Sequence, residues 1–222
     1  MMTFFIVLAA AAQAYLLGSV DTGILVSKYL YHDDVRNHGS GAAGMTNMLR
    51  TFGKKAAALT AAGDVLKGVA AVCIGRWLFG FLPADAAVSP YLGVYLTAIL
   101  AVVGHTKPIY FGFKGGKGVL VGAVMLAFFD WRVFVIAFAL FILSVVLTKW
   151  ISLGSILGAV SFPITTWLFY RDPVLTAMAF GMAAAVVFMH RSNIGRILHG
   201  TENKFSFKSK KTIEASPDGE EK

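Results

Sequence analysis

The sequence has little charge and almost no cysteine, and both shortages restrict the kind of protein it can be. Only 14% of the 222 residues are charged, whereas 57% are hydrophobic, which excludes an ordinary soluble domain. The one cysteine, Cys73, can form no intramolecular disulfide and has no cysteine partner for a metal site. Because it lies in an apolar run, we expect it to be a small buried hydrophobic residue. The composition predicts an integral membrane protein.

Several arrangements of catalytic or metal-binding residues are missing as well. None of the five histidines has the spacing of a zinc-binding HExxH helix, so no metal and no cofactor is expected. No histidine is followed five positions later by Asp, which excludes the commonest acyl-CoA-dependent glycerolipid acyltransferase machinery. The net charge of +8 does not predict nucleic-acid binding, because the basic residues stand between apolar runs instead of on one wet surface.

Seven apolar runs dominate the chain. They lie at residues 3–27, 56–75, 91–106, 118–129, 131–148, 151–170 and 173–189. A full crossing takes about 20 apolar residues, and the third and fourth runs are shorter. No Lys or Arg precedes the first run, as a secretory signal requires, so we expect this run to remain a span. The pattern predicts an all-α polytopic membrane protein with seven transmembrane helices, and five crossings with a re-entrant glycine-rich segment is the competing topology.

The distribution of basic residues predicts the orientation. With seven crossings and the N-terminus outside, the inner segments hold sixteen Lys and Arg residues and the outer turns hold three, Arg76, Arg132 and Arg171. Because cytoplasmic loops collect Lys and Arg, the C-terminus is expected in the cytoplasm. Residues 204–222 have almost no apolar side chains and are predicted to form a disordered cytoplasmic tail. The membrane domain is therefore expected over residues 1–203.

Three polar segments separate the runs and carry the candidate chemistry. The first, residues 34–50, interleaves glycines with Ser40 and ends at Arg50. Glycines allow backbone N–H groups to converge on an anion, and an arginine fork can complete the clamp. A flexible interhelical loop is the simpler alternative.

The second segment, residues 104–118, places lysines among glycines immediately before an apolar run. Its candidate phosphate cradle consists of Lys114, Gly115, Gly116, Lys117 and Gly118. Free N–H groups and the dipole at a helix N-terminus favour an anion there. The spacing is not that of a P-loop. A positive anchor at the membrane surface would explain the lysines but not the glycines.

The third segment follows the last run, where His190 and Asn193 stand three residues apart and so share one helical face. Arg191 and Arg196 are equally well explained as headgroup anchors. Within the apolar runs, Asp64 and Lys67 are three apart and are expected to pair inside the bundle.

Two serines at the start of the sixth run, Ser152 and Ser155, also share a face. Both hydroxyls are placed to bond an anion, and helix capping is the favoured alternative for Ser152.

In order and spacing, these segments resemble the PlsY-type acyl-phosphate:glycerol-3-phosphate acyltransferases of bacterial membranes. The resemblance covers residues 15–203 and rests on four linked motifs. They are Gly-Ser-Gly-x-x-Gly-x-Thr-Asn with Arg50, Asp64-x-x-Lys-Gly, Gly104-His-x-x-Pro with Phe113-Lys-Gly-Gly-Lys-Gly, and His190-Arg-x-Asn-Ile-x-Arg with Gly200-x-Glu. Ala42, Met45 and the stretch 19–23 depart from the usual family pattern.

The resemblance implies an enzyme of phospholipid synthesis in the bacterial inner membrane. Such an enzyme transfers an acyl group from acyl phosphate to the 1-hydroxyl of glycerol 3-phosphate, without acyl-CoA, metal or cofactor, and releases lysophosphatidic acid and phosphate. It implies catalytic roles for Ser40, Lys114, His190 and Asn193. The substrate-binding set would add Arg50, Gly115, Gly116, Lys117, Gly118 and Ser155. Membrane lipids and the soluble enzyme that makes acyl phosphate are the expected partners.

Two hypotheses from other functional classes, a transporter and a non-catalytic scaffold, are the alternatives to an enzyme. A transporter for phosphate or organic anions would line its path with basic glycine-rich loops. Transporter sites lie near the bilayer midplane between repeats, however, and the chain shows no internal repeat. A non-catalytic membrane scaffold would not explain why glycines and lysines occur together in three segments.

Overall fold

The computed structural model of the chain describes residues 1–82 and 90–206, apart from the side chains of residues 90–92. Regular structure within these ranges is entirely helical, as predicted. The helices are α1 (Met2–Ser19), α2 (Thr22–Tyr31), the 3-10 helix η1 (Val35–Asn37), α3 (Met45–Phe52), α4 (Lys54–Phe79), α5 (Pro90–Thr106), the 3-10 helix η2 (Ile109–Phe111), α6 (Val119–Phe129), α7 (Trp131–Thr148), α8 (Ile151–Tyr170), α9 (Pro173–Met189) and α10 (Arg191–Leu198).

The described residues make a polytopic membrane protein with five or six candidate spans. Five segments are long and apolar enough to cross a bilayer: Met2–Tyr31, Lys54–Phe79, Gly93–Phe111, Trp131–Thr148 and Ile151–Tyr170. A sixth span results if α9 and α10, which meet at a bend of 59°, cross together. Helix α6 has 11 residues and is about 16 Å long, too short for a hydrocarbon core of about 30 Å. The predicted set of seven full-length crossings is therefore supported only in part.

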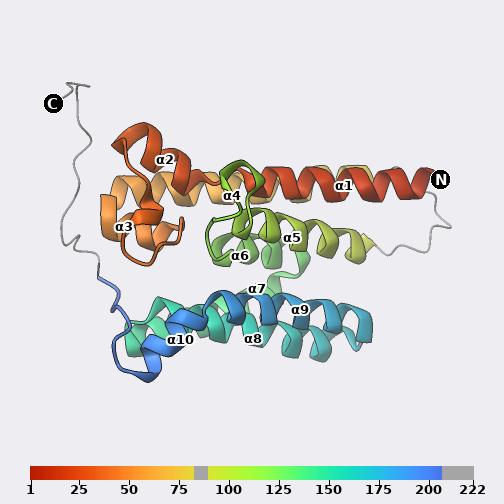
Figure 1. Cartoon of the computed structure of the whole chain (residues 1–222). Helices are drawn as coiled ribbons and strands as arrows, with labels where there is room; N and C mark the ends of the chain where they lie inside the picture. Colours follow the sequence, from red (N-terminus) through yellow and green to blue (C-terminus); the bar gives the residue numbers. More distant parts are fainter. Residues whose placement is uncertain (83–89, 207–222) are drawn as a thin grey trace.

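Two layers of helices build the bundle (Figure 1). Helix α1 packs against α4 and α5 in one layer, and α7, α8 and α9 pack side by side in the other. Helix α6 contacts α4, α5 and α7 and so joins the layers. Where α1 crosses α5, a Cβ atom on Gly18 would lie 2.2 Å from the Ala101 carbonyl oxygen, and one on Gly104 would lie 2.3 Å from that of Tyr15. Small residues bring the two backbones together, as is usual for helix pairs in lipid.

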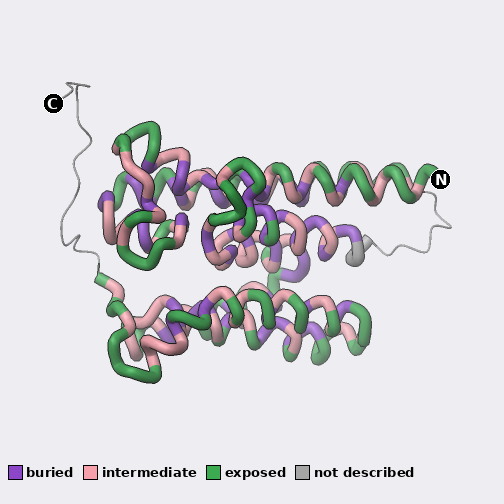
Figure 2. The backbone as a smooth tube through the Cα atoms, in the orientation of Figure 1, coloured by how far each residue is buried: buried purple, intermediate pink, exposed green. Residues whose placement is uncertain are grey.

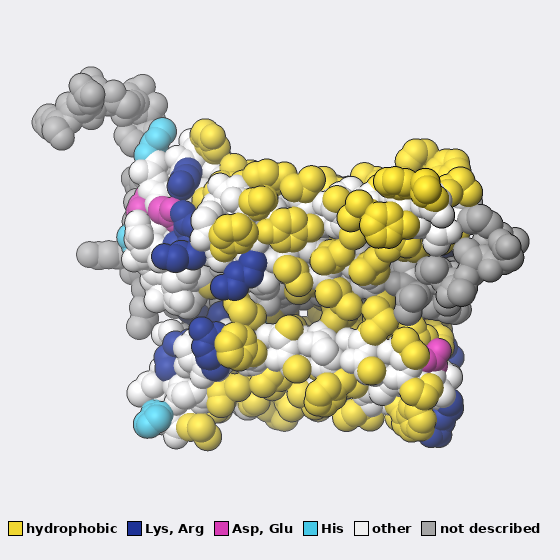
Figure 3. Space-filling view, turned by 45° about the vertical axis from the view of Figure 1, so that its right-hand side comes forward, with side chains coloured by type: hydrophobic (Ala, Val, Ile, Leu, Met, Phe, Trp, Pro, Cys, Tyr) yellow, Lys and Arg dark blue, Asp and Glu magenta, His cyan; other side chains and the backbone are white. Residues whose placement is uncertain are grey.

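The outer surface of the bundle is apolar. Buried and exposed positions alternate along the helices (Figure 2), and hydrophobic side chains cover the space-filling view between its two ends (Figure 3). Large exposed residues include Leu66, Trp77, Leu147 and Phe180. A surface of this kind suits lipid, not water. Cys73 belongs to it: the expectation that it is buried is wrong, because its position on α4 faces outward.

Candidate active site

A cavity of about 370 Å³ lies between the two layers. All three polar segments of the sequence contribute to its lining, through Ser40 and Arg50, Lys117 and Gly118, and His190 and Asn193. The remainder of the wall is largely apolar and includes Leu126 of α6, Phe134 and Phe138 of α7, Phe162 of α8 and Met182 of α9. One enclosure thus combines a basic polar end with a hydrophobic compartment.

Asn47 organises the first segment and places Ser40 at the cavity. The Asn47 side chain is buried, and its Oδ1 accepts a hydrogen bond from the Ser40 backbone N–H at 3.1 Å. The two hydrogens of its Nδ2 are shared among three backbone carbonyls, those of Val35 at 3.2 Å, His38 at 2.9 Å and Ala42 at 3.0 Å. Gly39 has a φ of +55°, and a Cβ there would lie 2.2 Å from Asn47 Oδ1, so only glycine fits. The sequence motif contains Asn47, but its role as the centre of this loop was not predicted.

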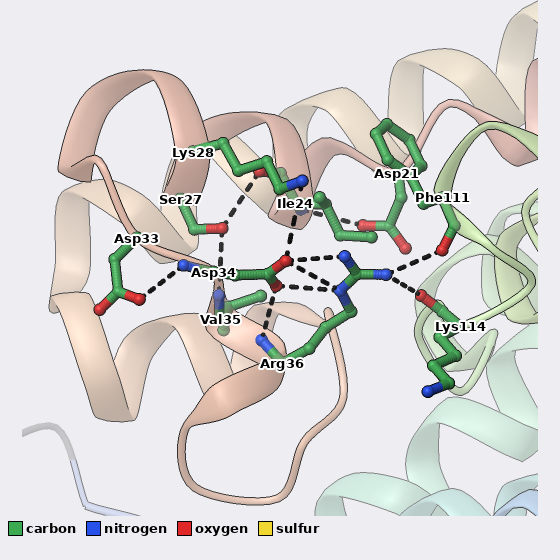
Figure 4. Close-up of polar contacts among 10 residues, drawn as sticks. All are labelled: Asp21, Ile24, Ser27, Lys28, Asp33, Asp34, Val35, Arg36, Phe111 and Lys114. Carbon is green, nitrogen blue, oxygen red and sulfur yellow. Dashed lines mark hydrogen bonds and ion pairs between the residues drawn. The ribbon is translucent and has the colours of Figure 1, made fainter.

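A second contact ties the first segment to the second (Figure 4). Arg36 pairs with Asp34, with Nη2 2.7 Å from Oδ2 and Nε 2.9 Å from Oδ1. Arg36 Nη1 then donates to the carbonyls of Phe111 at 2.8 Å and Lys114 at 3.2 Å. The hydrogen bonds from Arg36 hold the pKa of the Asp34 carboxyl below its ordinary value. The planar fork thereby fixes the segments carrying Ser40 and Lys117 relative to each other.

The predicted five-residue cradle is divided by the structure. Lys117 and Gly118 line the cavity, and Gly118, with a φ of +77°, is the residue directly before helix α6. Lys114 is exposed, and neither it nor the two glycines after it line the cavity. Gly115 and Gly116 instead pack on His105, where Cβ atoms would lie 2.1 Å from its carbonyl oxygen and 2.2 Å from Nε2. These two glycines are needed for close packing, and the Gly116 N–H donates to the His105 carbonyl at 3.1 Å.

Lys117 directs its ammonium group toward the third segment. It donates a hydrogen bond to Asn193 Oδ1. Burial, together with the nearby positive charge of Arg196, lowers the pKa of Lys117 to about 8. A lysine in this state gains from the arrival of an anion, because the anion restores the favourable environment of the charged form.

Glu202 is the centre of the third segment. Its Oε1 accepts hydrogen bonds from Asn193 Nδ2 and Ser152 Oγ, both at 2.8 Å, and its Oε2 accepts from Arg196 Nε at 2.7 Å. Burial alone would raise the pKa of Glu202, but these donors together hold it below its ordinary value. The favoured role of Ser152 as a helix cap is wrong, because its hydroxyl bonds Glu202. The fourth sequence motif contains Glu202, but its role as the centre of this segment was not predicted; its signal is that it is the one acid among the bases of residues 190–204.

Two further predicted residues face the cavity from α8 and from the α9–α10 break. Ser155 Oγ donates to the Ile151 carbonyl at 2.9 Å. His190 lies 2.8 Å through Nδ1 from the Val186 carbonyl. A carbonyl only accepts, so Nδ1 carries the proton and Nε2 is left for another partner.

Positive charge exceeds negative charge at the polar end. Arg50, Lys117 and Arg196 stand around a single neighbouring carboxylate, that of Glu202. Arg50 makes no hydrogen bond or ion pair within the described part of the chain. The site is therefore suited to anionic groups.

The match to known proteins agrees with this geometry. Residues 8–200 match the family model described as glycerol-3-phosphate acyltransferase. The chain belongs to this family. A glycerol-3-phosphate acyltransferase of Clostridioides difficile is 40% identical over 207 residues, covering 93% of this chain and 99% of that protein. One from Thermoanaerobacter sp. (strain X514) is 39% identical over 199 residues, covering 90% and 96%.

Two crystal structures of PlsY, an integral membrane glycerol 3-phosphate acyltransferase, have the same fold. The glycerol 3-phosphate form superposes with a TM-score of 0.79 at 32% identity, and the lysophosphatidic acid form with 0.75 at 30% identity. Each comparison covers 90% of this chain and 96% of the other. The family, the enzyme class and the multi-pass membrane location predicted from the sequence are confirmed.

In this glycerol-3-phosphate acyltransferase the predicted site residues fall into two groups. Seven of them line the cavity: Ser40, Arg50, Lys117, Gly118, Ser155, His190 and Asn193. Lys114, Gly115 and Gly116 stand beside it, on the segment that delivers Lys117. Eight polar residues outside the predicted site set also line the cavity: Thr46, Asn47, Asp64, His105, Ser152, Arg196, Glu202 and Asn203.

Proposed function

We propose that the chain transfers a fatty acyl group from acyl phosphate to the 1-hydroxyl of glycerol 3-phosphate. Lysophosphatidic acid and inorganic phosphate are the products. The observation that carries the proposal is the union of a basic polar end and an apolar compartment in one cavity. Both substrates present a phosphate to such a polar end, and only the acyl donor has a chain for the apolar part.

Phosphate groups bind between Arg50 and Lys117 in this proposal. Arg50 supplies a fork with no competing partner among the described residues, and Lys117 supplies a point charge. Ser40 and Gly118, the latter at the N-terminal end of α6, add a hydroxyl and a helix terminus. His190, Asn193 and Ser155 orient the glycerol part, because their polar groups face the cavity beside Lys117.

The acyl chain occupies the apolar compartment along α7, α8 and α9. His190, which directly follows α9, and Ala183 of α9 both line the cavity, and their separation of seven positions corresponds to about 10 Å of depth. Aromatic rings of Phe134, Phe138 and Phe162 supply the wall. Burying a chain there contributes about 0.8 kcal/mol per methylene.

The acyl transfer itself depends more on positioning the two substrates and neutralising their negative charge than on a reactive side chain. The 1-hydroxyl oxygen attacks the carbonyl carbon of acyl phosphate, and the bond from that carbon to the phosphate oxygen breaks. The hydroxyl proton passes to a phosphate oxygen, and inorganic phosphate leaves. Acyl phosphate already has a good leaving group, so holding the two substrates in reach and stabilising the negative oxygens supplies the acceleration. No metal or cofactor is needed for this sequence of events.

The membrane orientation completes the proposal. We place the N-terminus outside and the polar segments in the cytoplasm, with seven passes of which the short α6 is one. Two observations support this topology. The N-terminus of α1 and helix α10 lie at opposite ends of the bundle (Figure 1), and Lys and Arg side chains gather at the α10 end (Figure 3).

Two predictions concern the C-terminal end. Residues 207–222 of the proposed tail lie outside the described residues. Residues 204–206 are described, and the Phe205 N–H donates to the Lys149 carbonyl at 2.7 Å. The boundary at residue 203 and the partnership with the soluble enzyme that makes acyl phosphate stay predictions.

The deciding experiment uses the purified full chain in detergent or nanodiscs. It receives acyl phosphate and glycerol 3-phosphate, and lysophosphatidic acid and phosphate are both quantified. We expect equal amounts of the two products. Parallel reactions with acyl-CoA should give none, and equal turnover with acyl-CoA or no turnover with acyl phosphate would refute the proposal.

A further inference from the structure

A buried polar cluster under the second segment has no part in the reaction as described so far. Lys67 of α4 places its Nζ 2.8 Å from Asp64 Oδ1, 2.8 Å from the Val20 carbonyl oxygen and 2.9 Å from His105 Nδ1. Asp64, Lys67 and His105 are all nearly inaccessible. The ion pair expected from the spacing of Asp64 and Lys67 is confirmed, but the histidine from α5 is an addition that the sequence did not predict.

The contacts of Lys67 determine where His105 carries its proton. An ammonium group has three hydrogens to donate and no lone pair to accept. Nζ donates to the Val20 carbonyl, forms an ion pair with Asp64 Oδ1 and lies at hydrogen-bond distance from His105 Nδ1, so Nδ1 has to be the unprotonated nitrogen. A proton on Nδ1 would also set N–H against ammonium at 2.9 Å. The ring is therefore neutral, with its hydrogen on Nε2.

Acidic groups face the same ring and do not alter this assignment. Asp64 Oδ1 lies 3.7 Å from His105 Nδ1, and Asp21 Oδ2 lies 4.0 Å from it. Both distances are beyond a hydrogen bond, whereas the lysine contact is within it. Lys67 contacts both the carboxylate of Asp64 and the ring, and its ammonium pairs the negative charge of Asp64.

The protonated nitrogen, Nε2, is the ring nitrogen that Lys67 leaves free, and it lies against the segment that carries Lys117. His105 and Asp64 both line the cavity. Nε2 rests against Gly116, where a Cβ would come within 2.2 Å, and Lys117 is the next residue. Nε2 has no hydrogen-bond partner in the described part of the chain, and it is not among the fully enclosed unpaired polar atoms, which include Asp21 Oδ2.

We propose that His105 is a further substrate-contacting residue. It is a neutral imidazole, and its Nε2–H donates a hydrogen bond to an oxygen of a phosphate group bound beside Lys117. The proposal deepens the proposed function and rests on it. Lys67 acts behind the ring by fixing the tautomer, so that the site gains an oriented donor without gaining another positive charge. The Gly116 position is small because the ring has to pass there.

The first test reads the tautomer and phosphate contact without turnover. Full-length protein labelled with 15N at histidine is examined by NMR, in which protonated and unprotonated ring nitrogens have distinct signals. We expect His105 to keep a protonated Nε2 and an unprotonated Nδ1, and the Nε2 signal to shift when inorganic phosphate is added. A proton on Nδ1, or an Nε2 signal that phosphate leaves unchanged, would overturn the proposal.

The second test is a matched pair of variants. The amide of His105→Gln reaches about as far as Nε2, whereas that of His105→Asn reaches only as far as Nδ1. We expect the Asn variant to lose roughly 10- to 100-fold in kcat/KM, as for the loss of a hydrogen bond to a charged group, and the Gln variant to recover most of it. Equal losses in both variants would mean that the ring only braces Gly116, which contradicts the proposal.

The kinetic parameters also identify the phosphate concerned. A rise confined to the KM for glycerol 3-phosphate assigns the contact to the acceptor, and a rise confined to that for acyl phosphate assigns it to the donor. Failure of the wild-type enzyme to use acyl phosphate would count against the proposed function alone, because the NMR titration reports on His105 independently of turnover.

Discussion

Two polar clusters lie at opposite ends of helix α7, and they differ in how completely they satisfy themselves. At one end, Asp130 accepts hydrogen bonds from Arg132 Nη2 and Tyr170 Oη, both at 2.7 Å, and caps α7 through the Arg132 N–H at 2.8 Å. At the other end, the Glu202 cluster pairs with Arg196 and Asn193 but leaves Arg50 without a partner among the described residues. About 27 Å of helix separates them.

The difference distinguishes a structural cluster from a binding site. The Asp130 cluster matches its charges one to one, so it ends a helix and needs nothing more. The Glu202 cluster has one carboxylate for Arg50, Lys117 and Arg196. Unpaired cations in a partly buried site are unfavourable until an anion arrives, which is why a phosphate ligand is expected here and not at the other end.

The largest effect on activity is expected when a cation is removed from the Glu202 cluster, and this variant tests most directly whether that cluster is the binding site. Lys117→Met removes the ammonium that faces the cavity, and we expect kcat/KM to fall about 10²- to 10³-fold, as for loss of one oriented donor to a developing anion. Release of phosphate from acyl phosphate, with lysophosphatidic acid measured alongside, checks the loss.

Lys114→Met is the matched control, because Lys114 is exposed three residues earlier on the same segment. The structure leads us to expect a change of less than about threefold, since exposed substitutions are usually worth within 0.5 kcal/mol. If Lys114→Met is as damaging as Lys117→Met, the catalytic role predicted for Lys114 from the sequence is right and the cavity lining is the poorer guide.

The helical fold was largely predictable, because a long apolar segment in lipid satisfies its backbone hydrogen bonds by forming a helix. The break between α1 and α2 was not predicted. It depends on Asp21, whose side chain caps α2 by accepting from the Ile24 N–H at 3.2 Å, inside a run that otherwise looks continuous. The short length of α6 was visible in its run of 12 residues, 118–129, but which topology it implied was not.

The sequence placed Arg50 and Lys117 in a binding site because their residue types have one main use there, and both line the cavity. The site was not predictable where glycines serve packing or where an acid organises its neighbours. The sequence predicted that Gly115 and Gly116 bind an anion, yet the group they pack against is His105 of α5. Glu202 contacts Ser152 across 50 positions of sequence, and no local pattern reports such a contact.

The link between the first two segments gives the next largest expected effect. Arg36→Gln removes the fork that holds the Phe111 and Lys114 carbonyls, so Lys117 loses its fixed position. We expect kcat/KM to fall roughly 10- to 100-fold, because small misplacements at a reacting centre cost that much.

Lys28→Gln serves as the control for this link. Lys28 also approaches Asp34, at 3.8 Å, but its side chain is 48% exposed and it contacts neither carbonyl. Its kinetics should stay at the wild-type level. A loss in Lys28→Gln equal to that in Arg36→Gln would show that the charge near Asp34 matters and the fork does not.

The pH dependence of kcat/KM tests the role of one group of the Glu202 cluster, the ammonium of Lys117. The pKa of Lys117 is about 8 in the free protein, so raising the pH through this value removes its charge. We expect kcat/KM to fall about tenfold per pH unit above 8. A bound phosphate stabilises the charged form, so the corresponding fall in kcat should occur at higher pH. Lys117→Arg should move both limbs upward, and an unchanged limb in that variant would assign it to another group.

The apolar compartment is tested by filling it. Ala183 is buried and lines the cavity, whereas the adjacent Ala184 is exposed. Ala183→Leu should take space from the far end of the acyl chain, and each methylene excluded should cost about 0.8 kcal/mol, roughly fourfold in kcat/KM. Long acyl phosphates therefore lose more than short ones. Ala184→Leu should keep the wild-type preference, and a shared shift in both variants would contradict the placement of the chain.

The smallest effect on catalysis is expected at the satisfied cluster, where only stability should change. Asp130→Ala removes the cap of α7, worth roughly 1 kcal/mol, together with the bond from Tyr170, so the thermal unfolding temperature in detergent should fall. Hydrogen bonds from Arg132 lower the pKa of Asp130 to about 2. A carboxyl with a depressed pKa stabilises the fold above its ordinary value of 3.8 and loses that contribution as the pH falls toward 2. The wild-type unfolding temperature should drop over this range more than that of the variant, while kcat/KM of the two proteins at neutral pH should agree. A large loss of activity in Asp130→Ala would mean that the two ends of α7 are coupled, and the contrast between them would no longer separate structure from function.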